Sequence, residues 1–101
     1  MQEIDELPQS PGLKIALEEI EALEKKGDIN GAFEKTISSL SMIRISDAAL
    51  RCKLAALCNL KGDQVSAKAL FLKAIEHLRK EDDKEKKLIN AIKKEISQVD
   101  C

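Results

Sequence analysis

The chain has 101 residues, which is enough for one domain with a core of moderate size. Hydrophobic residues make up 44% and charged residues 35%, a balance that excludes both a disordered acidic tail and a membrane protein. The formal net charge of -1 hides an uneven distribution: the first 35 residues carry nine acids and four lysines, and the rest nine acids and thirteen bases. No apolar run could span a bilayer and the acidic start is unlike a signal peptide, so we expect a soluble cytoplasmic protein, with the nucleus left open.

Residues 1–11 are predicted to form an irregular leader, because Pro8 and Pro11 interrupt regular structure. Ser10 followed by Pro11 favours a helix start at this point, so the helical domain is expected over residues 12–101. A first amphipathic helix then ends at Lys25-Lys26-Gly27. Asp28 is the expected N-cap of a second helix.

The segment from Met42 to Ser46 is expected to connect to a third helix, capped by Ser46 or Asp47. A fourth helix is predicted from about Gln64 to Lys80. A fifth, capped by Asp82 or Asp83, carries apolar residues at helical spacing as far as Val99. Since only 2% of the residues are aromatic, β-sandwiches and base-stacking nucleic-acid modules are disfavoured, and the predicted fold class is all-α.

The tripeptide Lys26-Gly27-Asp28 recurs 35 residues later as Lys61-Gly62-Asp63, and each copy separates two amphipathic helices. Ala32 and Ala67 both lie five residues after their glycine. A period of 34 to 35 residues with two helices per unit is typical of the tetratricopeptide repeat. The pattern is clearest from Leu50 to Leu78, where small and large residues alternate as closely crossing helices require.

The chain therefore resembles the tetratricopeptide repeat family over residues 12–98. Ala67, Phe71 and Ala74 stand where that family places small, aromatic and small residues, whereas the first unit has Thr36 and Ser39 at the last two positions. The resemblance implies a right-handed superhelical array of antiparallel helix hairpins, with repeats at residues 13–45 and 46–80 and a C-terminal capping helix at residues 82–99. A generic five-helix bundle with the same helices is the alternative.

The sequence lacks the residue patterns of a catalytic or metal site. It has one histidine, no tyrosine, no nucleotide-binding glycine loop and no His-Glu-x-x-His motif, so we expect no enzyme activity and no cofactor. Cys52 and Cys58 lie six residues apart on separate faces of a helix and are expected to be buried thiols. Cys101 is expected to be exposed.

The resemblance also implies a concave groove that is lined by the first helix of each unit and holds a peptide or helix of another protein. The corresponding residues, here called the groove set, are acidic on the first helix and basic on the fifth, which suits a partner segment with its own charge asymmetry. Alternatively, the lysines only keep the capping helix soluble. The groove set is Lys14, Leu17, Glu21, Glu24, Ala49, Cys52, Lys53, Ala56, Asn59, Lys86, Lys87, Asn90, Lys93 and Lys94.

Val65, Ala69 and Leu72 form an outer stripe on the fourth helix, opposite the side that carries Phe71 and Ala74. A helix with two apolar faces is either central or covered by a partner. We therefore expect the outer stripe to contact another chain or a further repeat. Burial by the leader or by the fifth helix is the alternative.

Two functions follow from these features. The first is a non-enzymatic adaptor or scaffold subunit of a protein complex, which binds a peptide or helix in the groove. The second is a self-associating structural domain that forms a homodimer through the outer stripe. We expect no membrane partner and no small-molecule substrate, and nucleic acid is disfavoured because acids are interspersed among the lysines and aromatic residues are scarce.

Overall fold

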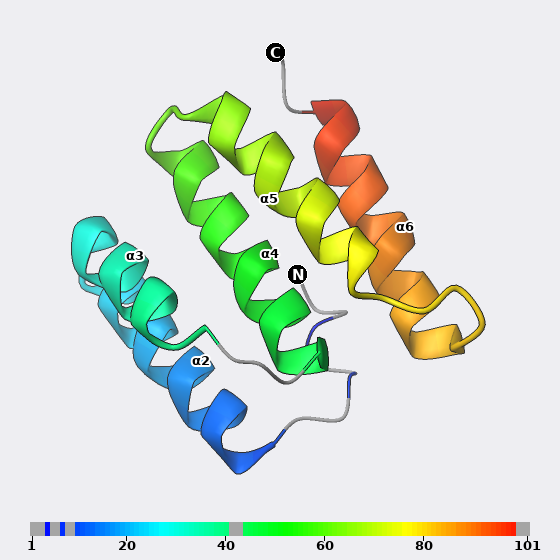
Figure 1. Ribbon diagram of the computed structural model, residues 1–101. Helices are drawn as coiled ribbons and strands as arrows, with labels where there is room; N and C mark the ends of the chain where they lie inside the picture. Colours follow the sequence, from blue (N-terminus) through cyan, green and yellow to red (C-terminus); the bar gives the residue numbers. More distant parts are fainter. Residues whose placement is uncertain (1–3, 5–6, 8–9, 41–43, 99–101) are drawn as a thin grey trace.

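The computed structural model describes residues 4, 7, 10–40 and 44–98. These residues are all-α, without a strand, and form the helices α2 (Pro11–Lys25), α3 (Ile29–Ser38), α4 (Arg44–Leu60), α5 (Gln64–Glu76) and α6 (Asp83–Gln98). Helices α2, α4 and α6 run in one direction and α3 and α5 in the other, so that α2–α3 and α4–α5 are antiparallel hairpins (Figure 1). The molecule measures 37 × 35 × 21 Å, and its smallest dimension matches two layers of helices.

Both hairpins turn through the same backbone conformation. Gly27 has a φ of 81° and Gly62 a φ of 85°, in the left-handed region that residues with a side chain disfavour. In each turn the amide that follows the glycine donates to the carbonyl five residues before it, at 3.0 Å in the first turn and 2.9 Å in the second. This bond satisfies a carbonyl at the end of the preceding helix.

The aspartate after each glycine caps the following helix. Asp28 accepts a hydrogen bond from the amide of Gly31 at 2.9 Å, and Asp63 accepts one from the amide of Ser66 at 3.1 Å. The predicted cap at Asp28 is therefore confirmed. Because the glycine conformation, the backbone bond and the cap all recur, the 35-residue sequence repeat is also a repeat of local structure.

Small residues bring the helices of each hairpin together. Ala32 and Ala67 are both fully buried at equivalent positions, and so are Thr36 and Phe71 four residues later. A threonine replaces the aromatic residue in the first unit without leaving a buried polar group unpaired, because its Oγ1 donates to the carbonyl of Ala32 at 2.7 Å. The first hairpin therefore keeps the close helix contact with a smaller side chain.

Two predicted helix starts are confirmed. Ser10 caps α2 by accepting from the amide of Leu13 at 3.2 Å, with Pro11 as the first helical residue. Asp82 precedes α6, and its Oδ1 accepts from the amide of Glu85 at 3.0 Å. Both contacts satisfy amides that the first turn of a helix leaves without a partner.

Two predicted boundaries were wrong. Helix α4 begins at Arg44, so that Ser46 and Asp47 lie inside its first turns and are buried rather than capping it. Asp47 instead accepts a hydrogen bond from Arg51. Helix α5 ends at Glu76 rather than Lys80, and the carbonyl of its C-cap residue His77 accepts a hydrogen bond from Arg44.

The leader contributes two residues to the core. Ile4 is 6% exposed and Leu7 is 3% exposed, and both belong to the same hydrophobic cluster as residues of α2, α4, α5 and α6. The amide of Leu7 donates to the carbonyl of Ile4 at 3.2 Å. From the sequence we considered packing of this segment only against the outer stripe, and not in the core. Met42, Val99 and Cys101, which also entered the sequence predictions, lie outside the described residues.

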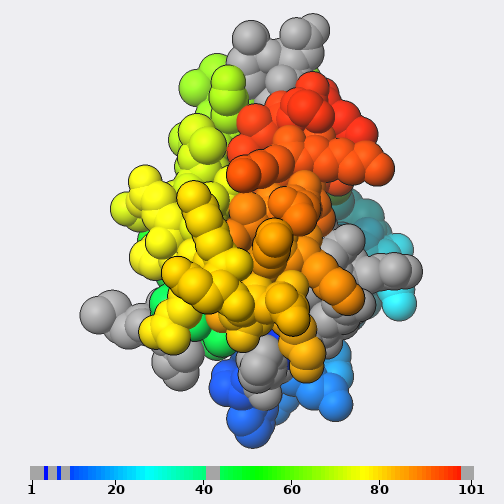
Figure 2. Space-filling model, turned by 90° about the vertical axis from the view of Figure 1, so that its right-hand side faces the viewer, coloured from blue at the N-terminus to red at the C-terminus, as the bar shows by residue number. Residues whose placement is uncertain are grey.

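Helix α6 covers one end of the array. Leu88, Ile89 and Ile92 are buried against the rest of the protein, while the lysines of α6 are exposed. Figure 2 shows α6 at this surface, beside α5. No helix in the described part of the chain is long and apolar enough to cross a membrane.

The glycine turns can be tested by substitution. We expect Gly62→Ala to lower the free energy of unfolding by about 1 to 2 kcal/mol, because alanine must adopt a left-handed φ at a position where its Cβ meets no neighbour within 4 Å. Urea denaturation measures the loss. Gly12→Ala is the matched control, since Gly12 also has open space around it but lies in the first turn of α2; no destabilisation is expected there. Equal losses of stability in both variants would contradict the requirement for glycine in the left-handed turn at Gly62.

The packing of the leader gives a second prediction. We expect Leu7→Ala to lower the free energy of unfolding by about 2 to 3 kcal/mol, as for other buried leucines. Ile15→Ala, at a side chain that is 56% exposed, should change it by less than about 0.5 kcal/mol. If Leu7→Ala is as mild as Ile15→Ala in the same urea titration, Leu7 does not belong to the core.

Candidate functional site

The face of α4 that belongs to the groove set is half covered and half open. Ala49 is 0% exposed and Cys52 is 1% exposed, whereas Ala56 and Asn59, further along the same face, are exposed to solvent. Exposure along this face therefore begins about halfway through α4. The open part of the expected groove lies only beside the C-terminal half of the helix.

The closed half is packed with the protein's own apolar residues. Leu17 and Cys52 of the groove set are in one hydrophobic cluster with Ile4 and Leu7 of the leader and with Ile89 of α6. Burial raises the pKa of the Cys52 thiol to about 12, so it is neutral and unreactive near neutral pH. The structure thus places Leu17 and Cys52 in the core rather than in an open lining.

The open half is bordered by an ion pair between two members of the groove set. Lys53 Nζ of α4 lies 2.8 Å from Glu24 Oε1 of α2, and both side chains are a quarter exposed or less. That carboxylate oxygen has no conventional hydrogen bond among the described residues, so the contact is a charge contact rather than an aligned hydrogen bond. It ties the end of α2 to the middle of α4.

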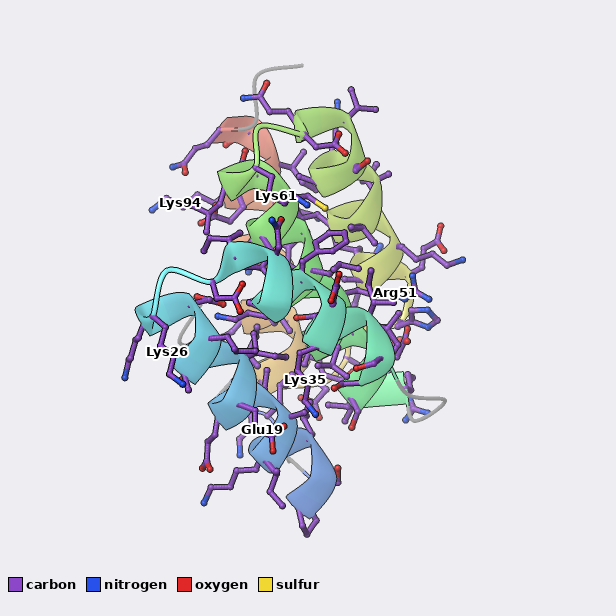
Figure 3. The ribbon with its side chains drawn as sticks, turned by 90° about the vertical axis from the view of Figure 1, so that its left-hand side faces the viewer. Glu19, Lys26, Lys35, Arg51, Lys61 and Lys94 are labelled. Atoms are coloured by element: carbon purple, nitrogen blue, oxygen red, sulfur yellow. The ribbon has the colours of Figure 1, made fainter. Side chains whose placement is uncertain are left out.

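The remaining members of the groove set are exposed on the flanking helices. Glu21 is exposed on α2, and Lys14 is exposed nearer the start of that helix. Those on α6 are exposed too: Lys86, Lys87, Asn90, Lys93 and Lys94. In Figure 3, Lys94 projects from the opposite side of the molecule to Arg51.

A polar cluster that was not recognised in the sequence joins the start of α4 to the end of α5 and the start of α6. Arg44 donates to both carboxylate oxygens of Glu85, with Nη2 to Oε2 at 3.3 Å, and to the carbonyl of His77 at 2.8 Å. His77 Nε2 lies 3.3 Å from Asp47 Oδ2. The amide of Arg79 also donates to Glu85 Oε1, at 3.1 Å. Glu85 is only 3% exposed, so these contacts are needed to offset its burial.

The outer stripe is exposed, as the self-association hypothesis requires. Val65 is 74% exposed and Leu72 is 48% exposed, and Ala69 lies open to solvent between them. The alternative expectation, that the leader or α6 buries the stripe, is therefore wrong for the described residues. Ile37 of α3 and Leu60 at the end of α4 are also exposed.

A cleft of about 350 Å³ lies beside the stripe, between α3 and α5. Its walls include Phe33 of α3 and Leu70 of α5, and the buried Cys58 of α4 also lines it. Lys61 Nζ lies 4.4 Å from the centre of the Phe33 ring, within the range of a cation–π contact. The lining residues are Phe33, Cys58, Lys61, Asp63, Ser66, Ala69 and Leu70.

A second cleft, of about 460 Å³, lies where α2 and α3 meet the start of α4. Lys35 Nζ and Glu19 Oε2, both from residues that line it, are 2.7 Å apart (Figure 3). These two opposite charges neutralise each other. Since its other lining residues are apolar or carry hydroxyls, the cleft offers no pair of acid–base groups for catalysis.

Within the described ranges, no three residues of the kinds that bind metals lie close enough together to hold an ion. Burial also raises the pKa of Cys58, so neither described thiol is an activated nucleophile. Ala56 and Asn59 of the groove set and the outer stripe with its cleft are exposed to solvent. Comparisons with protein-family models, with curated proteins and with solved structures found no match.

The polar cluster at the start of α6 gives a pH-dependent prediction. Hydrogen bonds from Arg44 hold the pKa of Glu85 below its ordinary value of 4.5, although burial acts in the opposite direction. The pKa of Glu85 is lower in the folded protein than in the unfolded chain, so the ionised carboxylate stabilises the fold. This stabilisation is complete above the unfolded-state pKa and is lost as the pH falls through the folded-state pKa. We expect wild type to be more stable than Glu85→Gln above about pH 5, with the difference shrinking as the pH falls below about 4.

Urea denaturation at a series of pH values from about 7 down to about 3 measures this difference. Glu81→Gln is the control, because Glu81 is exposed on the loop before α6. Its stability should follow the wild type throughout. A Glu85→Gln variant that is as stable as wild type near neutral pH would contradict the role of this carboxylate.

Proposed function

We propose that the chain is a non-enzymatic protein-interaction module, an adaptor or scaffold subunit built as a tetratricopeptide-like array of two hairpins and a capping helix. Its ligand is a short segment of another protein, bound along the open half of the groove. The observation that carries the proposal is the change along α4 from the buried Cys52 to the exposed Ala56 and Asn59. The equivalent Gly27 and Gly62 turns support the repeat architecture.

The exposed part of α4 suits close contact with a peptide backbone. Ala56 presents only a methyl group, and Asn59 presents an amide that can both donate and accept hydrogen bonds. A segment lying there can therefore approach the helix closely and still have its polar groups satisfied. The closed half of the same face, toward the start of α4, is packed with Leu7 and its neighbours, so the open half is continuous with the hydrophobic core.

The acidic residues of α2 and the basic residues of α6 favour a peptide with opposite charges at its two ends. Helix α2 presents Glu21 and α6 presents Lys93, both exposed. The Lys53–Glu24 pair between them is already neutralised and adds little net charge. The ligand we propose carries a basic residue toward α2, small or apolar residues over Ala56, and an acidic residue toward α6.

Selection from a displayed library of random 12-residue peptides, with the full chain as bait, tests the proposal. We expect a consensus with a basic residue on one side of a small apolar centre and an acidic residue on the other side. Glu21→Lys should remove the preference for the basic residue, and Lys93→Glu the preference for the acidic one. Fluorescence polarisation with a selected peptide should show about a tenfold loss of affinity for each variant.

Lys68→Glu is the matched control, because Lys68 is an exposed lysine of α5 outside the groove set. It should leave the consensus and the affinity unchanged. Ala56→Trp should block binding by filling the open half. Peptides that bind the Ala56→Trp variant as well as wild type, or a selection without a consensus, would overturn the proposal.

A further inference from the structure

We infer that the chain also pairs with a second copy of itself, through the outer stripe and the cleft beside it. In this dimer α5 packs antiparallel against α5 of the other copy, with Ala69 nearest the two-fold axis. Val65 of one copy then lies near Leu72 of the other. This interface uses none of the groove set and is independent of the proposed function.

The first argument is the exposure of the stripe itself. Val65, Ala69 and Leu72 are spaced so that they share one side of α5, while Phe71 and Ala74 on the other side are buried. Ile4 and Leu7 of the leader and the apolar residues of α6 pack into the core and leave the stripe exposed. Val65 is 74% exposed and Leu72 is 48% exposed. They are two of the five large hydrophobic side chains that are exposed in the described part of the chain.

The second argument is that the surface is complementary to itself. In a two-fold dimer the same patch serves both copies, so it must hold both a projecting side chain and a hollow that can receive it. Here Val65 and Leu72 project, and the cleft of about 350 Å³ borders the stripe at Ala69, which is the member of the stripe that lines it. The cleft is large enough for one leucine or valine side chain. Ala69 is small enough to let the axes of two packed helices approach to about 8 Å.

The third argument is the charge of the patch, which favours another copy over a strongly charged partner. The exposed charges of α5 and the turn before it are of both signs, and α3 adds one acid. A second copy therefore meets no net repulsion, and a highly acidic or basic protein gains no attraction. These residues are Lys61, Lys68, Lys73, Asp63, Glu76 and Glu34.

The size of the patch sets the strength of the pairing. Helix α5 has 13 residues and is about 20 Å long, so two such helices side by side bury less than the roughly 800 Å² per copy of a standard interface. We expect a reversible dimer with a dissociation constant on the order of 10 μM.

Analytical ultracentrifugation of the full chain from about 1 to 500 μM tests the pairing. We expect the apparent mass to rise from 11.2 kDa toward twice that value across this range. Leu72→Asp should weaken dimerisation by at least thirtyfold, because it places a charge in the apolar contact. Ile15→Asp is the matched control, since Ile15 is 56% exposed on α2, away from the stripe, and it should dimerise like wild type. Circular dichroism confirms that each variant is folded.

A crosslinking experiment tests the position of the axis. Ala69→Cys in a Cys101→Ser background should crosslink to its own copy with a short bis-maleimide, whereas Ile15→Cys should not. Cys52 is buried, and Cys58, which lines the cleft near Ala69, is replaced by alanine in the same background so that it does not compete. A wild type that stays monomeric over the whole range would overturn the proposal. Equal weakening by Leu72→Asp and Ile15→Asp, or crosslinking of Ile15→Cys as efficient as that of Ala69→Cys, would overturn it as well.

Discussion

The fold depends on a sharp turn that only glycine makes without strain. At Gly27 and Gly62 the backbone has a left-handed φ, and the aspartate that follows caps the next helix. The same turn therefore ends one helix and begins the next, and it sets the antiparallel direction of each hairpin. Because both turns have the same bonds, α2–α3 and α4–α5 are two copies of one local arrangement.

Helix α4 connects the two hairpins, and its surroundings decide which faces remain free. In its first half the face that carries Ala49 and Cys52 is buried, and both residues' neighbours include Ile4, Leu7 and residues of the other helices in one hydrophobic cluster. Arg44 and Glu85 hold the start of α4 to the start of α6, at the corner where the chain leaves α5. The second half of the α4 face that carries Ala56 and Asn59 is exposed, and so is the outer side of α5. Both binding proposals follow from this division.

Much of this structure could be predicted from the sequence, because it is encoded by local signals. The Ser10, Asp28 and Asp82 caps, the glycine turns and the burial of the two helical cysteines depend on short-range chemistry and were confirmed. The outer stripe is exposed, which was one of the expected outcomes. The helical spacing of its residues places them on the side of α5 opposite the buried Phe71.

The features that were missed depend on contacts between distant parts of the chain. Ile4 and Leu7 carry an apolar pattern too short to show that they enter the core. Arg44, at the start of α4, pairs with Glu85, 41 residues away, and no local rule indicates that pair. The resemblance to the repeat family predicted that Leu17 and Cys52 line an open groove. It could not show that Ile4 and Leu7 join them in one hydrophobic cluster.

Methyl–methyl nuclear Overhauser effects, recorded on dilute protein with labelled Ile, Leu and Val methyl groups, test the division into packed and open faces most directly. We expect contacts from Ile4 and Leu7 to Leu17 and Ile89. Val65 and Leu72 should show no contact with the core. If Val65 and Leu72 instead contact core methyl groups while Ile4 and Leu7 contact none, the helices enclose a single closed centre, and neither proposed surface exists.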